Sequence, residues 1–182
     1  CGVMNGTVPL FLEGDLQGDV LVDGMVPAKV GTAKMAAHVG LVFGDPDMQL
    51  FGMTVEEDVA FGPANLGLDY PTIMERVHKS LVDMRLTGLE RRAPYRLSGG
   101  ERQATAIAGV YAMLPDIMVL DEPTSMLDPQ GKASVFSIIK RLKEELGITV
   151  ILVEQEVDDV LELADRVFVM NAGRFVLQGT PR

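Results

Sequence analysis

Residues 117–128 read IMVLDEPTSMLD, and this stretch decides the fold. It begins with an apolar run without polar alternation, which is typical of a strand that is covered on both faces in a parallel sheet. Asp121 and Glu122 follow where this strand should end, and open α/β sheets place their ligands at this end of the strands. One carboxylate there can hold Mg²⁺ while the other reaches an attacking water. The simpler alternative is a solvated acidic pair that opens a turn before Pro123.

Helices and strands alternate on both sides of this stretch. Helical spacing of apolar residues predicts helices over residues 55–66, 71–86, 99–114 and 156–164, with a further helix after Pro129. Short apolar runs predict strands over residues 20–24, 38–43, 148–153 and 166–170, and the run at 148–153 is again expected to be covered on both faces. The order of strands and helices implies a parallel sheet with right-handed crossovers.

A second motif, LSGGE, occupies residues 97–101. Ser98 is predicted to cap the helix that follows, and the free N–H groups at a helix start favour an anion such as a phosphate. Gly99 and Gly100 carry no side chain, so a ligand can approach the backbone closely. Yet the sequence contains no G-x-x-x-x-G-K-[ST] loop, the motif that supplies a backbone cradle and a lysine for the phosphates of a nucleotide.

The composition is that of a globular domain. The chain has 182 residues, a formal net charge of −10 and one cysteine. The acidic charge makes nucleic-acid binding a poor candidate, and no apolar run approaches the roughly 20 residues needed to span a bilayer. Since the sequence begins with Cys1 and ends directly after a strand-like run, we expect a fragment that is cut at both ends.

The two motifs together resemble those of ATP-binding-cassette (ABC) ATPases. LSGGE is similar to the signature motif, and IMVLDEPTSMLD to the Walker B motif and the D-loop that follows it. Residues 39–68, VGLVFGDPDMQLFGMTVEEDVAFGPANLGL, resemble the Q-loop region of ATPases from energy-coupling-factor (ECF) transporters and their cobalt-importer relatives. These relatives take up vitamins and metal ions.

This resemblance covers nearly the whole chain and implies an architecture. It implies one ABC ATPase domain over residues 1–182, incomplete at both ends and beginning just after the Walker A helix. Residues 1–43 and 115–182 would form an α/β core of the P-loop NTPase (RecA-like) class. Residues 44–114 would form an inserted α-helical subdomain that carries the signature motif.

The resemblance also assigns roles to residues. Asp121 corresponds to the aspartate that supports Mg²⁺, and Glu122 to the general base that polarises the hydrolytic water. The signature residues would contact the ATP that a partner ATPase subunit binds; they are Ser98, Gly99, Gly100 and Glu101. Asp128 corresponds to the D-loop aspartate at the interface between the two subunits.

Departures from the family pattern concern the nucleotide that the chain itself would bind. Walker A is missing, for which we favour truncation as the explanation. Gly44 stands where the family usually has the Q-loop glutamine, and Gln155 stands at the switch position where it usually has histidine. Glutamine can donate a hydrogen bond to a γ-phosphate, but it carries neither a proton nor a positive charge at neutral pH.

The expected function is that of the ATP-binding subunit of an ABC importer of the ECF type. ATP hydrolysis with Mg²⁺ would drive uptake of a vitamin or metal ion, with the chain bound peripherally at the cytoplasmic face of the membrane. The expected partners are a second ATPase subunit, identical or different, a transmembrane coupling subunit and a separate substrate-binding membrane protein, but no nucleic acid. Met48 and Met53 lie near the family's docking region for the membrane subunit, with core filling as the alternative.

A non-catalytic role is the alternative function. In that case the chain would complete a partner's nucleotide site through LSGGE and hydrolyse little at its own. The sequence does not identify the transported substrate, because in this family a separate membrane protein selects it.

Overall fold

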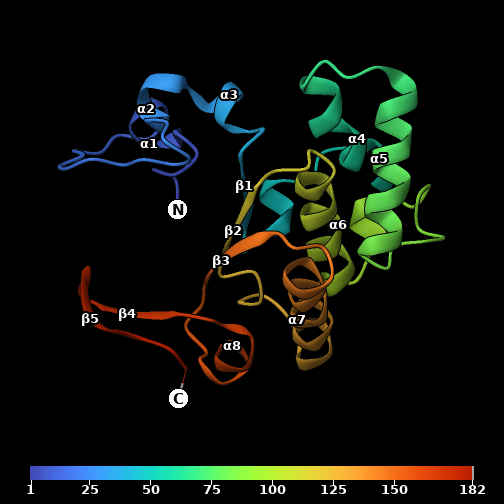
Figure 1. Cartoon of the computed structure of the whole chain (residues 1–182). Coiled ribbons are helices and arrows are strands. Elements are labelled where there is room, and N and C mark those ends of the chain that lie inside the picture. Colours follow the sequence, from blue (N-terminus) through green and yellow to red (C-terminus); the bar gives the residue numbers. More distant parts are fainter. Residues whose placement is uncertain (182) are drawn as a thin grey trace.

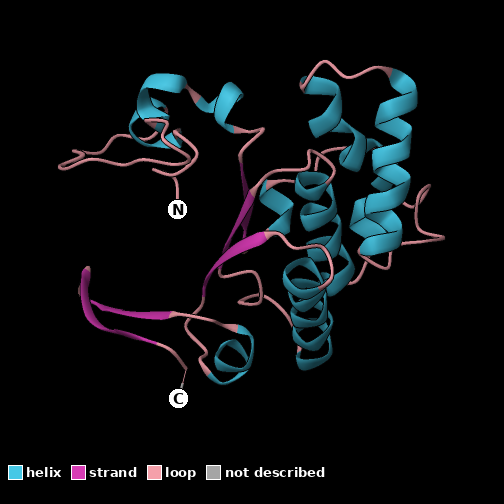
Figure 2. Cartoon of the chain, viewed as in Figure 1, coloured by secondary structure: helices cyan, strands magenta, loops and turns pink. Residues whose placement is uncertain are grey.

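The computed structural model describes residues 1–181, so Arg182, the last residue of the predicted second core segment, lies outside the described residues. Figure 1 shows the arrangement of the elements, and Figure 2 shows the same view coloured by secondary structure. In chain order the elements are α1 (Thr7–Leu10), α2 (Pro27–Val30), α3 (Thr32–Met35), β1 (Val39–Phe43), the 3-10 helix η1 (Pro46–Met48), α4 (Val55–Asn65), α5 (Tyr70–Asp83), the 3-10 helix η2 (Pro94–Arg96), α6 (Gly99–Tyr111), β2 (Ile117–Asp121), α7 (Pro129–Glu144), β3 (Thr149–Val153), α8 (Asp158–Leu163), β4 (Val167–Asn171) and β5 (Arg174–Gly179).

Strands β1, β2 and β3 form a three-stranded parallel sheet in the order β1-β2-β3. The predicted α/β class and the parallel sheet are therefore confirmed. Helices α4 to α7 gather on one side of this sheet, while the N-terminal segment and the β4–β5 hairpin lie toward its other side (Figure 1). Within residues 1–181, no helix combines the length and the apolar character that crossing a membrane requires.

Side-chain caps fix where the long helices begin. The Thr54 hydroxyl accepts from the Glu57 N–H at the start of α4, and the Asp69 carboxylate accepts from the Thr72 N–H at the start of α5. Three acidic residues in the first turn of α4 also complement the positive end of its dipole. Each cap satisfies an N–H group that has no partner within its own helix.

Both faces of the sheet contribute to the core, but unequally. The larger cluster joins one sheet face to helices α4 to α7 and includes Met118, Leu120 and Ile107, all fully buried. At Gly40 in β1 a side chain is excluded, because a Cβ there would overlap a methyl carbon of Val110 in α6. Within the described part of the chain, the opposite sheet face packs against the N-terminal segment, in the small cluster of Val22, Met35, Val39 and Val119.

Three expectations from the sequence were wrong. Residues 20–24 form no strand but a turn closed by an isolated bridge between Val22 and Met25, because Asp23 and Gly24 both adopt positive φ. β3 is only half-buried, since it lies at an edge of the three-stranded sheet. β4 does not join the parallel sheet; it pairs with β5 as a separate antiparallel hairpin. The division at residues 44 and 114 stays a prediction.

Candidate functional site

The carboxyl ends of the three parallel strands meet at one edge of the sheet. The register aligns Phe43, Asp121 and Val153 at the last positions of β1, β2 and β3. The residues that follow these positions therefore leave the sheet side by side, among them Gly44 and Glu122. Three of the predicted site segments, which lie far apart in the sequence, are brought together in this way, as expected for an open α/β sheet.

Glu122 is held from several directions. Its N–H donates to the Val153 carbonyl at 2.8 Å, and its own carbonyl accepts from the N–H and hydroxyl of Ser125 at 3.1 and 3.0 Å. Its Oε1 accepts a hydrogen bond from Nε2 of Gln155 at 2.7 Å. The predicted switch residue thus contacts the predicted base directly, with a neutral amide where a histidine would bring a titratable ring.

The backbone of Glu122 is strained. Its φ is 51°, a left-handed conformation that costs a non-glycine residue roughly 1–2 kcal/mol. Strained residues of this kind persist where the surrounding structure over-determines them, and they cluster at functional sites. The hydrogen bonds to Val153, Ser125 and Gln155 provide that over-determination.

Asp121 offers a carboxylate for Mg²⁺. Among the described residues its side chain makes no hydrogen bond or ion pair, so its oxygens are uncommitted. No group of three or more acidic, histidine or cysteine side chains able to hold a metal occurs within residues 1–181. This donor set fits Mg²⁺ held by one or two carboxylates together with phosphate oxygens, the usual arrangement in nucleotide sites, and not a cage built from protein alone.

The signature segment forms a capping box at the start of α6. The Ser98 N–H donates to Oε2 of Glu101 at 2.7 Å, and the Glu101 N–H donates to the Ser98 hydroxyl oxygen at 3.3 Å. Ser98 is exposed, and its hydroxyl proton is not used by the cap. The predicted cap is confirmed, and Glu101 is found in the capping box, while its contact with a nucleotide stays a prediction.

The two signature glycines have a packing role that the sequence did not indicate. A Cβ at Gly100 would lie 3.1 Å from the Cα of Gly131 in α7, and a Cβ at Gly99 would lie 3.1 Å from a methyl carbon of Leu127. These glycines therefore let the start of α6 approach the D-loop and α7 closely. Asp128 caps α7 by accepting from the Gly131 N–H at 2.7 Å, which fixes the same contact from the other side.

Gly44 packs against the backbone of the predicted catalytic segment. A Cβ at this position would lie 2.6 Å from the Glu122 carbonyl oxygen and 3.0 Å from that of Asp121. A glutamine side chain cannot enter here unless one of these segments moves. The surrounding structure thus requires a glycine at the Q-loop position, because the Glu122 carbonyl occupies the space that a Cβ would take.

Two buried hydrogen-bonding groups near the site were not singled out by any sequence pattern. Gln103 in α6 is fully buried and donates from Nε2 to the Phe43 carbonyl at 2.9 Å. Thr124, 2% exposed, donates from its N–H and hydroxyl to Oε1 of Glu154 at 3.1 and 2.8 Å. Gln103 directly follows the charged Glu101 and Arg102, so no local pattern distinguished it as buried, and none distinguished Thr124.

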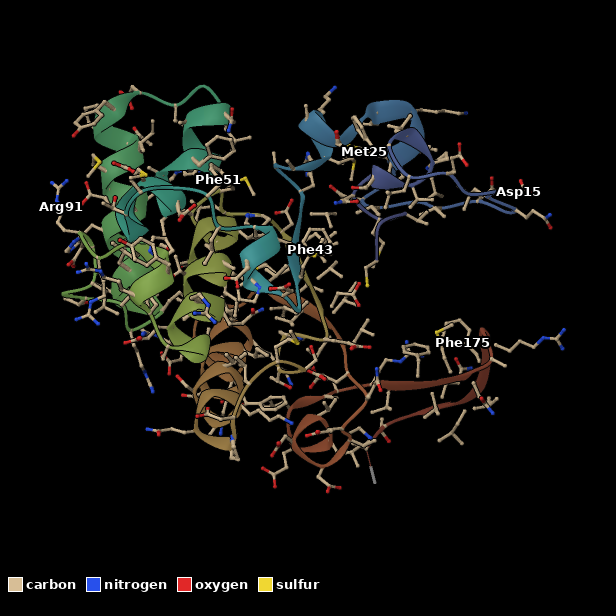
Figure 3. All side chains as sticks on the ribbon, turned by 180° about the vertical axis from the view of Figure 1, so that it is seen from behind. Asp15, Met25, Phe43, Phe51, Arg91 and Phe175 are labelled. Atoms are coloured by element: carbon tan, nitrogen blue, oxygen red, sulfur yellow. The ribbon has the colours of Figure 1, made fainter. Side chains whose placement is uncertain are left out.

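An apolar groove lies beside η1, α4 and α6, with a volume of about 450 Å³. Figure 3 places Phe51, at the edge of this groove, on the helical side of Phe43. The exposed apolar side chains here are Met48, Phe51 and Phe61, with Met53 also exposed close by in sequence. Asp58 lines the groove and is 7% exposed; its Oδ1 accepts from two backbone N–H groups, whereas its buried Oδ2 has no partner among the described residues.

Comparisons with known proteins agree with this geometry. The family model described as ABC transporter matches residues 10–125. The energy-coupling factor transporter ATP-binding protein EcfA of Methanothermobacter thermautotrophicus is 46% identical over 185 residues, covering 99% of this chain and 59% of the relative. EcfA of Methanoculleus marisnigri is 47% identical over 163 residues, covering 90% of this chain and 59% of the relative.

A solved structure of an ABC transporter protein is also similar to this chain. The cbiO1 protein of Clostridium perfringens, described as part of the ABC transporter complex cbiONQ, matches with a TM-score of 0.86 and 36% identity. The match covers 99% of this chain and 70% of that one. The chain spans less than two thirds of the length of the two EcfA relatives.

Proposed function

We propose that this chain, which belongs to the ABC transporter family, is part of the ATP-binding subunit of an importer of the ECF type. In this proposal the subunit binds and hydrolyses ATP, and the energy drives uptake of a vitamin or metal ion. The observation that carries the catalytic part is Glu122, which stands at the carboxyl end of a central strand and is hydrogen-bonded to Gln155.

Glu122 would act as general base. Its carboxylate accepts the proton of the water that attacks the γ-phosphate, while the amide of Gln155 holds one carboxylate oxygen in place. Since Gln155 is neutral, it orients the base through a hydrogen bond and not through an ion pair. Asp121 would hold Mg²⁺, which neutralises charge on the β and γ phosphates when bound.

The signature residues would act on a second nucleotide. In this proposal Ser98, Gly99, Gly100 and Glu101 face the ATP of a partner ATPase subunit, and Asp128 lies at the interface between the two. The α6 start supports this, because its N–H groups and dipole favour a γ-phosphate. Whether the partner is a second copy or a different chain is left open by this proposal.

The apolar groove would receive the transmembrane coupling subunit. Its exposed Met48, Phe51 and Phe61 suit an apolar segment. The buried Oδ2 of Asp58, which has no partner among residues 1–181, suits a segment that brings one hydrogen-bond donor. Docking there would place the chain peripherally at the cytoplasmic face of the membrane. A separate membrane protein would select the substrate.

The test is ATP turnover of the assembled transporter that contains this chain, with Glu122→Gln against wild type. We expect turnover to fall by about 10²-fold or more, because a general base contributes that much, while the Gln155 hydrogen bond can still form. Glu144→Gln, an exposed carboxylate on α7, is the matched control and should leave turnover unchanged. Equal turnover in Glu122→Gln and wild type would refute the assignment of the base.

A non-catalytic role is the second candidate, and Gly44 favours it. The space for a Q-loop side chain is taken by the Glu122 carbonyl, so the own site lacks the group that usually contacts the metal and the water. Under this candidate, wild type and Glu122→Gln turn over equally slowly at this chain's own site. Ser98→Ala would then lower turnover at the partner's site.

A further inference from the structure

Gln49 fills the place of a neighbouring strand at the end of β1. Its Oε1 accepts from the Phe43 N–H at 2.7 Å, and its Nε2 donates to the Leu41 carbonyl at 3.2 Å. In a parallel ladder, one residue of the adjacent strand bonds to the carbonyl of residue i−1 and the N–H of residue i+1. Leu41 and Phe43 stand in that relation, so a side-chain amide here does what a peptide group of another strand would do.

Phe43 is also held by the signature helix. Its carbonyl accepts from Nε2 of Gln103, which is fully buried in α6, at 2.9 Å. The N–H and the carbonyl of one residue are thus fixed by two amide side chains from different segments. Figure 3 shows Phe43 between Phe51, which lies in the loop before α4, and the N-terminal segment that carries Met25.

The residue after Phe43, Gly44, lies against the backbone of the predicted base, Glu122. Gly44 approaches the Glu122 carbonyl so closely that a Cβ would lie 2.6 Å from the oxygen. A displacement of Phe43 and Gly44 toward β2 must therefore move the Glu122 carbonyl, which Ser125 holds by two hydrogen bonds.

The other end of this series of contacts lies in the groove. Gln49 lines the groove together with Met48 and Phe51, so a segment that docks there contacts the loop that carries the Gln49 amide. From these contacts we propose that Gln49 is a positioning residue that links the groove, through Phe43 and Gly44, to the backbone of Glu122. This proposal rests on the proposed function. In it, backbone contacts of Phe43 and Gly44 take the role of the Q-loop glutamine side chain, whose position is occupied by Gly44.

The test replaces Gln49 by methionine, which keeps the length of the side chain but has no amide. In the assembled transporter we expect kcat to fall about tenfold or more, since a small misplacement of a catalytic group has effects of this size, while KM for ATP stays the same. Amide hydrogen exchange at Phe43 should become about fivefold faster, the factor expected for loss of one ordinary hydrogen bond. Exchange at Ser125 should also become faster, because its acceptor, the Glu122 carbonyl, is less firmly held.

Two controls separate positioning from general damage. Gln178→Met makes the same chemical change on the exposed hairpin and should leave kcat and both exchange rates unchanged. The amide of Met84, which donates to Ser80 at the end of α5, should keep its exchange rate in Gln49→Met if the fold is intact.

The hydrogen-exchange measurement tests the proposal independently of ATP hydrolysis. Unchanged exchange at Phe43 or at Ser125 in Gln49→Met would overturn it, even where Glu122→Gln abolishes turnover as proposed. Faster exchange at both amides with an unchanged kcat in an active transporter would overturn it as well. If wild type turns over no ATP, the proposed function fails, and faster exchange at both amides still supports the link from Gln49 to the Glu122 backbone.

Discussion

Helix α6 and the β4–β5 hairpin use their apolar side chains in opposite ways. Most of α6 is buried, because it lies against α4, α5, α7 and β1. No residue of β4 or β5 is buried, and Phe175 and Leu177 are 68% and 65% exposed (Figures 1 and 3). α6 and the strand β4 form as the sequence pattern indicates, whereas the pairing of β4 with β5 was not predicted. The pattern thus decides the element, while the neighbours decide its pairing and its burial.

The difference places the site in the well-packed region. Glu122 and Gly44 lie at the carboxyl ends of the parallel strands, where Glu122 bonds to Gln155 and Gly44 approaches the Glu122 carbonyl, and Gln103 joins α6 to the end of β1. A site that has to hold its groups within fractions of an ångström needs such support. The hairpin, by contrast, contributes nothing to the predicted site residues.

The largest expected effect comes from a cavity in α6. Ile107→Ala removes a fully buried side chain from the main core and should lower the free energy of unfolding by about 2–5 kcal/mol. Leu177→Ala in β5 should change it by less than about 0.5 kcal/mol, because the side chain is largely exposed. Urea unfolding of the two variants measures both values. Equal losses would mean that the hairpin is as tightly packed as α6.

A smaller effect is expected from the ionic cluster that joins α5, α6 and α7. Asp83, 5% exposed, accepts from Arg141 Nη2 at 3.0 Å, from Lys79 at 2.7 Å and from the Tyr111 hydroxyl at 3.0 Å. Arg141→Met should cost about 2 kcal/mol, the value of hydrogen bonds to a charged group, because Lys79 and Tyr111 still hold the carboxylate.

The matched substitution lies two residues further along α7. Lys143→Met breaks an ion pair with the highly exposed Asp165 next to the hairpin, and it should cost no more than about 1 kcal/mol. Urea midpoints of both variants, measured at low and high salt, test the difference. A larger loss in Lys143→Met than in Arg141→Met would reverse the order of the two regions.

The smallest expected effect is a loss of stability at alkaline pH. The hydrogen bond to Asp83 raises the pKa of Lys79, and burial raises the pKa of the Tyr111 hydroxyl, with Asp83 adding to it. Both groups keep their proton to a higher pH in the folded chain than in the unfolded chain. Their contribution to the free energy of unfolding is therefore present below about pH 10 and is lost as the pH rises through their pKa values in the folded chain.

Unfolding midpoints between about pH 9 and pH 11.5 measure this loss, because both folded pKa values lie above the ordinary values of tyrosine and lysine. Tyr111→Phe removes one of the two titrating groups and should flatten the decline, whereas Leu177→Ala should keep the wild-type slope. A decline that is the same in all three proteins would assign the loss to groups outside the helical region.

The sequence was sufficient where local signals agree. The start of α6 could be predicted from Ser98 and the small residues after it, because the cap and the spacing agree. The strand β2 could be predicted from its uninterrupted apolar run, because the run agrees with burial on both faces. It was insufficient where pairing between distant segments decides. Residues 20–24 look like a strand but turn at Asp23, and β4 is apolar like β3 but pairs with β5.

The candidate site divides in the same manner. Asp121 and Glu122 could be placed at a strand end from the sequence, and their roles stay predictions from the family resemblance. The hydrogen bond from Gln155 to Glu122 and the close approach of Gly44 depend on the register of three strands, which no local pattern specifies. The amides of Gln49 and Gln103 were missed because glutamine is ordinarily a surface residue.

The amide of Gln49 has a consequence for solubility. Among the described residues, β1 lies at an edge of the parallel sheet, and edge strands invite pairing with a strand from another molecule. The Leu41 carbonyl and the Phe43 N–H are already bonded to Gln49, so this end of the edge offers an incoming strand no free donor or acceptor at those positions. The Gln49 side chain thereby opposes edge-to-edge strand pairing between copies of this chain, and with it aggregation.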